Sequence, residues 1–188
     1  MLLAISGSPR KQSNTTAILQ KILTECTKEG FNTKLLELAK SPIQPCTDCG
    51  MCRTKLDCSI KDNFLSLIPD LQKAKIILVG SPVYFGTVSA QLKAFMDRTV
   101  MLRRNGFTLA DKFGCGIAIA GSRNGGQEHT IQTIHNWMFI HDMNVFADGK
   151  PTSHFGGILN AHEFGGAEKD EVGMQTISSL IEKIKRIL

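Results

Sequence analysis

Ile76–Val79 constrains the fold more than any other segment, because all four of its side chains are apolar. A strand without a polar side is buried on both faces, as the central strands of parallel sheets are. Phe113–Ala120 has the same character. Around these runs lie segments whose apolar residues recur at helical spacing, such as Ile18, Leu19 and Ile22. Apolar strands that alternate with amphipathic helices predict an α/β protein with a parallel sheet.

The predicted elements alternate strictly along the chain. We expect strands at 2–6, 32–38, 76–79, 113–120 and 144–147. We expect helices at 14–29, 89–98, 129–141 and 170–187, and a further helix that Asp62 caps. In segments 39–61 and 148–169 the apolar residues do not recur at the spacing of a helix or a strand, so we expect loops there. Right-handed crossovers then give a doubly wound, five-stranded parallel sheet in the flavodoxin-like order 2-1-3-4-5, with helices on both faces, as one domain over residues 1–188.

Composition excludes several other classes of protein. Of the 188 residues, 42% are hydrophobic and 21% are charged, which is typical of a globular chain and not of a disordered one. The longest apolar stretch, 113–122, is shorter than the roughly 20 residues of a membrane helix, and no secretory signal is recognisable. The net charge of +5 is mild, and one Tyr and one Trp offer little stacking surface for bases. We expect a cytoplasmic protein that binds neither nucleic acid nor membrane.

The segment Ser6–Thr15 joins the first predicted strand to the first predicted helix and carries the groups that a phosphate needs. These are the backbone N–H groups at a helix N-terminus, the guanidinium of Arg10, the amide of Asn14 and the hydroxyls of Ser8, Ser13 and Thr15. The chain contains neither a Walker A loop nor a G-x-G-x-x-G fingerprint. The segment therefore predicts a site for one monophosphate, and the alternative is an ordinary capped turn between strand and helix.

Two further loops leave the same edge of the predicted sheet. Residues 81–87 combine a rigid proline, two aromatic residues and a glycine, so a planar ring could lie on their backbone. Residues 121–126 contain three glycines that permit close approach, and Arg123 or Asn124 could meet the carbonyl oxygens of a ring. The alternative for the first of these loops is that Tyr84 and Phe85 simply cover the core. This edge is where α/β sheets bind their ligands.

Together the three loops resemble the FMN loops of NADPH-dependent FMN reductase-like flavoproteins, and the resemblance covers at least residues 1–147. It implies that the first loop binds the FMN phosphate, that the second borders the isoalloxazine ring and that the third touches the far side of the ring. The implied FMN-binding residues are Ser6, Ser8, Arg10, Ser13, Asn14, Thr15, Pro82, Val83, Tyr84, Phe85, Gly86, Ser122, Arg123, Asn124 and Gly125.

Four cysteines fall within thirteen residues in the pattern C-x2-C-x2-C-x5-C: Cys46, Cys49, Cys52 and Cys58. A compact run of this kind suits a [4Fe–4S] cube, in which each iron takes one thiolate. Structural zinc, which prefers two well-separated C-x2-C pairs, and a disulfide or free-thiol arrangement are the alternatives. Cys26 and Cys115 lie in apolar surroundings and are expected to be buried core residues.

The spacing of the four cysteines and their position after the second strand resemble the iron–sulfur flavoproteins of anaerobic archaea and bacteria. This resemblance implies FMN plus a [4Fe–4S] cluster, a one-electron donor such as ferredoxin or alternatively NAD(P)H, and an acceptor such as oxygen or peroxide. It also implies a homodimer or homotetramer in which the cluster faces a neighbour's flavin. The cofactors would carry the chemistry, so we name no catalytic side chain.

Two other functions remain open at this point: a cluster-free NAD(P)H-dependent FMN or quinone reductase, and a one-domain electron carrier or redox sensor. Arg98, Arg103 and Arg104 follow one another closely on the third helix and beyond it, and we interpret them as a solvated basic face rather than a docking site. The helical histidines His129, His135 and His141 are interpreted as structural, because a six-residue spacing spreads them around the helix.

Overall fold

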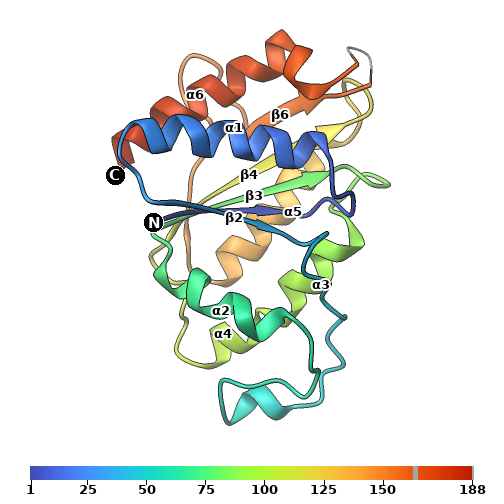
Figure 1. The fold of residues 1–188 in the computed structure, drawn as a ribbon, viewed down its shortest axis with the longest axis vertical. Coiled ribbons are helices and arrows are strands. Elements are labelled where there is room, and N and C mark those ends of the chain that lie inside the picture. The colour runs from blue at the N-terminus through green and yellow to red at the C-terminus, as the bar shows by residue number, and fades with distance from the viewer. Residues whose placement is uncertain (163–164, 188) are drawn as a thin grey trace.

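The computed structural model describes residues 1–162 and 165–187. It contains a parallel sheet in the order β2-β1-β3-β4-β5, with a sixth strand, β6, also paired to β4 (Figure 1). The strands are β1 (Leu2–Ser6), β2 (Thr33–Glu37), β3 (Ile76–Pro82), β4 (Phe113–Ala120), β5 (Asn144–Val145) and β6 (Gly157–Asn160). The predicted parallel sheet and its strand order are confirmed.

Helices cover both faces of the sheet (Figure 1). On one face lie α1 (Asn14–Lys28) and α6 (Glu171–Ile187). On the other face lie α2 (Phe64–Lys73), α3 (Ala90–Arg98), α4 (Val100–Arg104) and α5 (Gln127–Ile140). None of the helices in residues 1–162 and 165–187 combines the length and the apolar character needed to cross a membrane.

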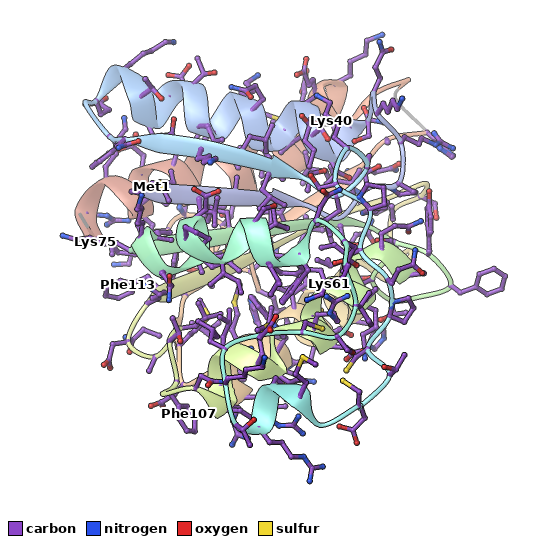
Figure 2. All side chains as sticks on the ribbon, turned by 60° about the horizontal axis from the view of Figure 1, so that its bottom comes forward. Met1, Lys40, Lys61, Lys75, Phe107 and Phe113 are labelled. Atoms are coloured by element: carbon purple, nitrogen blue, oxygen red, sulfur yellow. The ribbon has the colours of Figure 1, made fainter. Side chains whose placement is uncertain are left out.

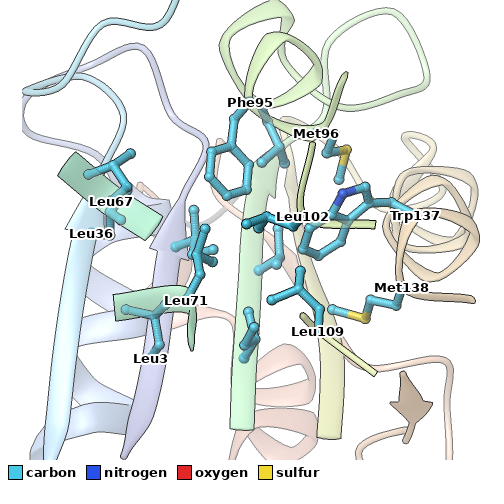
Figure 3. Close-up of a cluster of buried hydrophobic side chains, with 14 of the residues drawn as sticks. Leu3, Leu36, Leu67, Leu71, Phe95, Met96, Leu102, Leu109, Trp137 and Met138 are labelled. Atoms are coloured by element: carbon cyan, nitrogen blue, oxygen red, sulfur yellow. The ribbon is translucent and has the colours of Figure 1, made fainter. Parts of the chain in front are cut away.

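The alternation of side chains along β1 explains the two cores. Leu2 and Ala4 are fully buried against α1 and α6, whereas Leu3 and Ile5 are fully buried on the opposite face. Figure 3 shows the core on the face of Leu3 and Ile5, in which Phe95 and Trp137 lie above Leu3 in this view. A strand that buries every side chain specifies a central position in the sheet.

The region after β4 differs from the prediction. The expected strand 144–147 is only two residues long, and β6 forms within 148–169, which we expected to be a loop. The two short strands share one edge of β4: β5 pairs with Phe113 and Gly114, and β6 pairs with Ile117 through Ala120. Neither strand is long enough to leave a periodic signal, which explains the missed element. The same holds for the five-residue α4, and for the short 3-10 helices η1 (Met51–Arg53) and η2 (Ala167–Lys169).

The parallel register brings three loops to one edge of the sheet. Ser6 at the end of β1 lies opposite Gly80 in β3, and Gly80 lies opposite Ile117 in β4. Gly7 donates its N–H to the Gly80 carbonyl at 2.8 Å, so the first loop leaves the sheet directly beside β3. A side chain on Gly7 would lie within 2.7 Å of Leu92, which explains why this turn needs glycine.

Candidate functional site

A cavity of about 420 Å³ opens at the carboxyl edge of the sheet, where the three loops meet. The first loop and the start of α1 form one wall, β3 and its loop form a second, and the end of β4 forms a third. Residues of each predicted loop line it: Ser8, Arg10, Ser13, Asn14 and Thr15 from the first, Pro82, Val83 and Tyr84 from the second, and Gly121 from the third. Residues of the three loops that the sequence brought together therefore make up more than half of the lining of this cavity.

The start of α1 forms a corner of the cavity that has the features of an anion-binding site. Ser13 caps the helix, because its Oγ accepts a hydrogen bond from the Thr16 N–H at 3.1 Å. The first turn of α1 contains no acidic residue, so the positive end of the helix dipole is not neutralised there. Arg10 is exposed beside it and lines the cavity. Free helix N–H groups next to a guanidinium favour a doubly charged anion such as a phosphate.

Two residues of the first loop are also committed to the fold. The Ser6 Oγ lies 2.9 Å from the Thr16 Oγ1 and is absent from the lining of the cavity. The Asn14 Oδ1 accepts a hydrogen bond from the Ala167 N–H at 3.1 Å, which ties η2 to the start of α1. Asn14 also lines the cavity, and its Oδ1 is already engaged by Ala167.

The second loop is a tight turn that projects from the sheet. Tyr84 and Thr87 exchange backbone hydrogen bonds of 2.9 and 3.2 Å, and Phe85 and Gly86 occupy the tip with φ values of 49° and 77°. The Phe85 ring is fully exposed, so it does not cover the core. Phe85 and Gly86 stand outside the residues that line the cavity, whereas Pro82, Val83 and Tyr84 border it.

The third loop is held by contacts that the sequence did not predict. The Arg123 guanidinium donates to Asp170, which lies just before α6, instead of pointing into the cavity. Arg123 and Asn124 line a neighbouring cavity of about 410 Å³. Ser122 and Gly125 lie outside both linings, and Ser122 accepts a hydrogen bond at its carbonyl from the Gln127 amide. Specific contacts with α6 and α5, which the sequence pattern does not reveal, therefore hold this loop.

Asp170 is the fixed point of the third loop. Its side chain is almost fully buried and also accepts hydrogen bonds from the Asn160 N–H at 2.8 Å and the Gly173 N–H at 3.1 Å. Burial by itself raises the pKa of this carboxyl, but the hydrogen bonds from Arg123 and the two amides outweigh it and lower the pKa below its usual value. Asp170 is therefore an ion at neutral pH that joins the loop after β4 to β6 and α6.

The four clustered cysteines line a second, separate pocket against the end of α3 and α4. Cys46 and Cys49 are exposed, Cys52 and Cys58 are half-buried, and all four are free thiols. Figure 2 shows this segment, in cyan, between the labelled Lys40 and Lys61. Gly50, with φ of 81°, makes the turn between Cys49 and Cys52 possible. A loop with one short 3-10 helix thus brings all four thiols around one space.

Each of three thiols has its own hydrogen-bond partner. The Asp48 N–H points to the Cys46 Sγ at 3.4 Å, the Ser59 Oγ lies 2.9 Å from the Cys49 Sγ, and the Arg104 guanidinium donates to the Cys52 Sγ at 3.1 Å. The hydrogen bonds from Ser59 and the Met51 backbone lower the pKa of the Cys49 thiol. Within the described residues, no three Cys, His, Asp or Glu side chains converge closely enough to share a single metal ion.

A buried arginine anchors the two ends of the cysteine-rich segment. Arg98 is 2% exposed; it donates to the Gln44 carbonyl at 3.0 Å and to both carboxylate oxygens of Asp62 at 3.0 and 3.2 Å. Asp62 also accepts from the Gln44 and Phe64 N–H groups; the N-cap of α2 is Asn63, not Asp62 as predicted, and Asp62 lies one residue before it. The interpretation of Arg98 as part of a solvated face was wrong, because this long-range pairing with Asp62 buries it.

Comparison with known proteins places the chain in a family. Residues 1–156 match the family described as NADPH-dependent FMN reductase. An iron–sulfur flavoprotein of Methanocaldococcus jannaschii is 42% identical over 100% of this chain and 96% of its own length. An iron–sulfur flavoprotein of Methanosarcina thermophila is 44% identical over 98% of this chain and 93% of its own. The chain belongs to the iron–sulfur flavoprotein branch of the FMN reductase family. The predicted family and the prediction of an FMN-dependent oxidoreductase are thereby confirmed.

Solved structures support the architecture that this family shares. An apo-form NADH:FMN oxidoreductase matches with a TM-score of 0.72 at 17% identity, over 100% of this chain and 89% of that chain. A flavodoxin, WrbA-like protein from Agrobacterium tumefaciens matches with a TM-score of 0.65 at 16% identity, over 99% and 95% of the two chains. At such identities the likeness shows the fold alone, and it confirms the flavodoxin-like prediction.

Most of the cysteines and histidines that we set aside in this flavoprotein chain are buried, in agreement with the structural role expected of them. Cys26 and Cys115 are fully buried, and burial raises the pKa of the Cys26 thiol to about 11 and that of the Cys115 thiol further. Burial likewise lowers the pKa of His135 and of His141 to about 4, so both are neutral at physiological pH. His129 is exposed at the start of α5.

Sequence reasoning missed several residues that line the flavoprotein's edge cavity. They are Gln12, Ala17, Ile119, Ala120, Ala161 and His162. His162 follows β6 and packs over Gly121, where an added Cβ would lie 3.0 Å from the His162 Nδ1. Because 148–169 was expected to be a loop, nothing placed His162 at this edge. The pairing of β6 with the end of β4 is what delivers it.

Proposed function

We propose that this iron–sulfur flavoprotein accepts single electrons at the cysteine-rich segment and passes them to FMN at the carboxyl edge of the sheet. Membership of the family gives the chain FMN and an iron–sulfur cluster as cofactors and an electron-transfer role. The observation that carries the proposal is the presence of two separate sites in one chain: a phosphate-type corner at α1 and a pocket lined by four free cysteines. In this proposal residues 1–188 form one FMN-binding domain, and 39–61 carry the cluster.

The first loop supports FMN as the flavin. We assign the phosphate to the start of α1, with Ser8, Ser13 and Thr15 as hydroxyl donors, and Arg10 as the cation. One helix N-terminus and one arginine match a single terminal phosphate. We assign the edge of the ring to Pro82, Val83 and Tyr84, which border the same cavity. Phe85 and Gly86, and the third-loop residues Ser122, Arg123, Asn124 and Gly125, stay predictions as ring contacts, as does Ser6 as a phosphate contact.

The cysteine pocket fits an iron–sulfur cube by its donor set. Cys46, Cys49, Cys52 and Cys58 are free, belong to one loop and line one pocket. In a [4Fe–4S] cube each thiolate binds a different iron, so the four sulfurs need not converge on one point. N–H and O–H donors already point at three of the sulfurs, as is usual around such clusters. We therefore assign these four cysteines as ligands of the cluster, which would supply one-electron chemistry when bound.

The donor and the acceptor follow from the same proposal. A cluster takes electrons singly, so a one-electron carrier such as ferredoxin is the matching donor, and FMN can then deliver electrons in pairs to oxygen or peroxide. We also propose a homodimer or homotetramer in which the cysteine pocket of one chain faces the flavin cavity of another. Light scattering on the purified protein tests the assembly, and a monomer would contradict that part.

One anaerobic sample tests the core of the proposal. Iron, acid-labile sulfide and flavin are measured together with the absorption spectrum. We expect about four irons and four sulfides per chain and one FMN, with a broad charge-transfer band under the flavin bands. Zinc in place of iron, or iron without sulfide, would contradict the cluster assignment and leave the flavin assignment intact.

A second candidate is a cluster-free reductase that takes hydride from NADPH directly at the flavin, and the description of the matching family favours it. The discriminating measurement is turnover with NADPH in protein whose iron content is known. Full turnover in iron-free protein would favour this candidate, whereas turnover that depends on iron and on a reduced ferredoxin would favour the first.

A further inference from the structure

Within the part of the chain that the structure describes, the end of α4 makes side-chain hydrogen bonds to one of the four cysteines, Cys52. The Arg104 Nη1 donates to the Cys52 Sγ at 3.1 Å, and the Asn105 Nδ2, one residue further on, donates to the Cys52 carbonyl at 3.0 Å. The same Asn105 amide donates to the Met101 carbonyl at 2.8 Å, so Cys52 is tied to the helix itself. Both the sulfur and the backbone of this cysteine are therefore held from α4.

Among the described residues, Cys52 alone of the four cysteines receives a cationic hydrogen bond at its sulfur. Cys46 faces a backbone N–H and Cys49 faces a hydroxyl, both of which are neutral. The nearest counter-charge to Arg104 is Asp48, whose carboxylate lies 3.6 Å from Nη2 and is mostly exposed. Water screens an exposed carboxylate, so it offsets only part of the guanidinium charge at the sulfur.

We infer that Arg104 is a positioning residue that fixes the Cys52 thiolate and raises the reduction potential of the group that the four cysteines bind. The inference rests on the proposed function, because it takes Cys52 as a cluster ligand. One-electron reduction adds a negative charge to an already anionic group. A guanidinium hydrogen-bonded to one ligand sulfur stabilises the more negative state more strongly, and hydrogen bonds to sulfur are an established determinant of cluster potential. Arg104 thus makes this pocket an easier electron acceptor.

The neighbouring Arg103 provides a matched control. It lies on the same short helix, is exposed in the same way, and its guanidinium carbon lies 5.0 Å from the centre of the Phe107 ring instead of near a sulfur. Arg103→Gln and Arg104→Gln therefore remove one positive charge each at nearly the same place. A difference between them isolates the direct contact with Cys52 from the general field of the basic surface.

The experiment compares wild type, R104Q, R104K and R103Q, all prepared anaerobically, by potentiometric titration followed by electron paramagnetic resonance of the reduced cluster. We expect R104Q to titrate at a more negative potential with an altered spectrum, R104K to lie between R104Q and wild type, and R103Q to match wild type. The FMN content and the FMN potential should be the same in all four proteins, because Arg104 is not part of the edge cavity.

Potentials that are identical in R104Q, R103Q and wild type would overturn the inference and leave the proposed function standing. Equal negative shifts in R104Q and R103Q would also overturn it, because the general field would then explain both. If R104Q retains no iron, R104K decides: a potential below that of wild type supports the inference, and an unchanged potential overturns it. Iron-free wild-type protein would refute the proposed function and this inference together.

Discussion

The carboxyl edge of the sheet, to which we assign FMN (the flavin edge), and the cysteine-rich segment are each held by an Asp–Arg junction. The two junctions differ in which partner is buried. At the edge, Asp170 accepts from two backbone N–H groups and from Arg123. At the cysteine segment, Asp62 accepts from two backbone N–H groups and from Arg98. In the first junction the carboxylate is buried and the Arg123 side chain is 35% exposed; in the second it is the Arg98 side chain that is buried, at 1%.

The difference reflects what each junction has to hold. The loops of the flavin edge leave β1, β3 and β4, so the sheet fixes them before Asp170 adds the third loop to α6. The cysteine segment contains only the three-residue η1, so its shape depends on side chains from α3 and α4. A site built on strands tolerates the loss of one polar contact, whereas a site built on a loop depends on each contact.

Replacing each cysteine by alanine should have the largest effect and should separate the two regions completely. We expect Ala at position 46, 49, 52 or 58 to remove or degrade the cluster and to leave FMN bound, because the flavin cavity is lined from other segments. Iron and flavin analysis of each variant measures both outcomes. Cys26→Ala and Cys115→Ala are the controls, and loss of iron in Cys115→Ala with full iron in Cys58→Ala would show that the ligand set is wrong.

Replacing the carboxylate of each junction by a neutral amide should show how much stability each junction provides. Asp62→Asn leaves the Arg98 guanidinium buried without its counter-ion, and we expect a loss of about 3–5 kcal/mol in the free energy of unfolding. Asp170→Asn should cost less, because water can reach the exposed part of Arg123. Urea unfolding of both variants measures the two values. A larger loss for Asp170→Asn would contradict the idea that the cysteine segment depends more on its junction.

Arg10→Ala should affect only the flavin edge. Loss of one charge-assisted hydrogen bond to phosphate costs about 1.5–3 kcal/mol, which is about a ten- to a hundredfold rise in the dissociation constant for FMN. Flavin fluorescence titration of the apoprotein gives the constant, and iron content provides the internal control. If the affinity for FMN does not change, Arg10 lies outside the phosphate site.

Lowering the pH should give the smallest and most gradual loss in the free energy of unfolding. Burial raises the pKa of Asp62, but the hydrogen bonds from Arg98 and the Gln44 and Phe64 amides outweigh it, so the folded pKa lies below the usual value. Its contribution to stability is therefore complete above an unfolded pKa of about 3.9 and is lost as the pH falls below that value. Urea unfolding between pH 3 and 6 should show this decline in wild type and a shallower one in Asp62→Asn. Parallel curves would assign the decline to other groups.

The sequence predicted the central sheet well, because strands such as Ile76–Val79 and helices such as α1 carry long periodic signals. It predicted the four-cysteine pocket from spacing alone, since all four thiols lie on one loop. It could not predict that Arg98 meets Asp62 or that Arg123 meets Asp170, because each pair joins segments far apart in the chain. In the third loop, the sequence therefore did not reveal that Arg123 is held by Asp170, just before α6.

The division of the strand beside β4 into β5 and β6 bears on how this sheet avoids aggregation. Exposed strand edges can pair with another chain, and a long, flat, apolar edge is the most dangerous kind. Here the outer strand at one side consists of a two-residue piece and a four-residue piece with a loop between them. At the other side, β2 carries Lys34, which forms an ion pair with Asp70 at 2.7 Å, and ends in Glu37. Interruption at one edge and charge at the other leave each a poor template for a foreign strand.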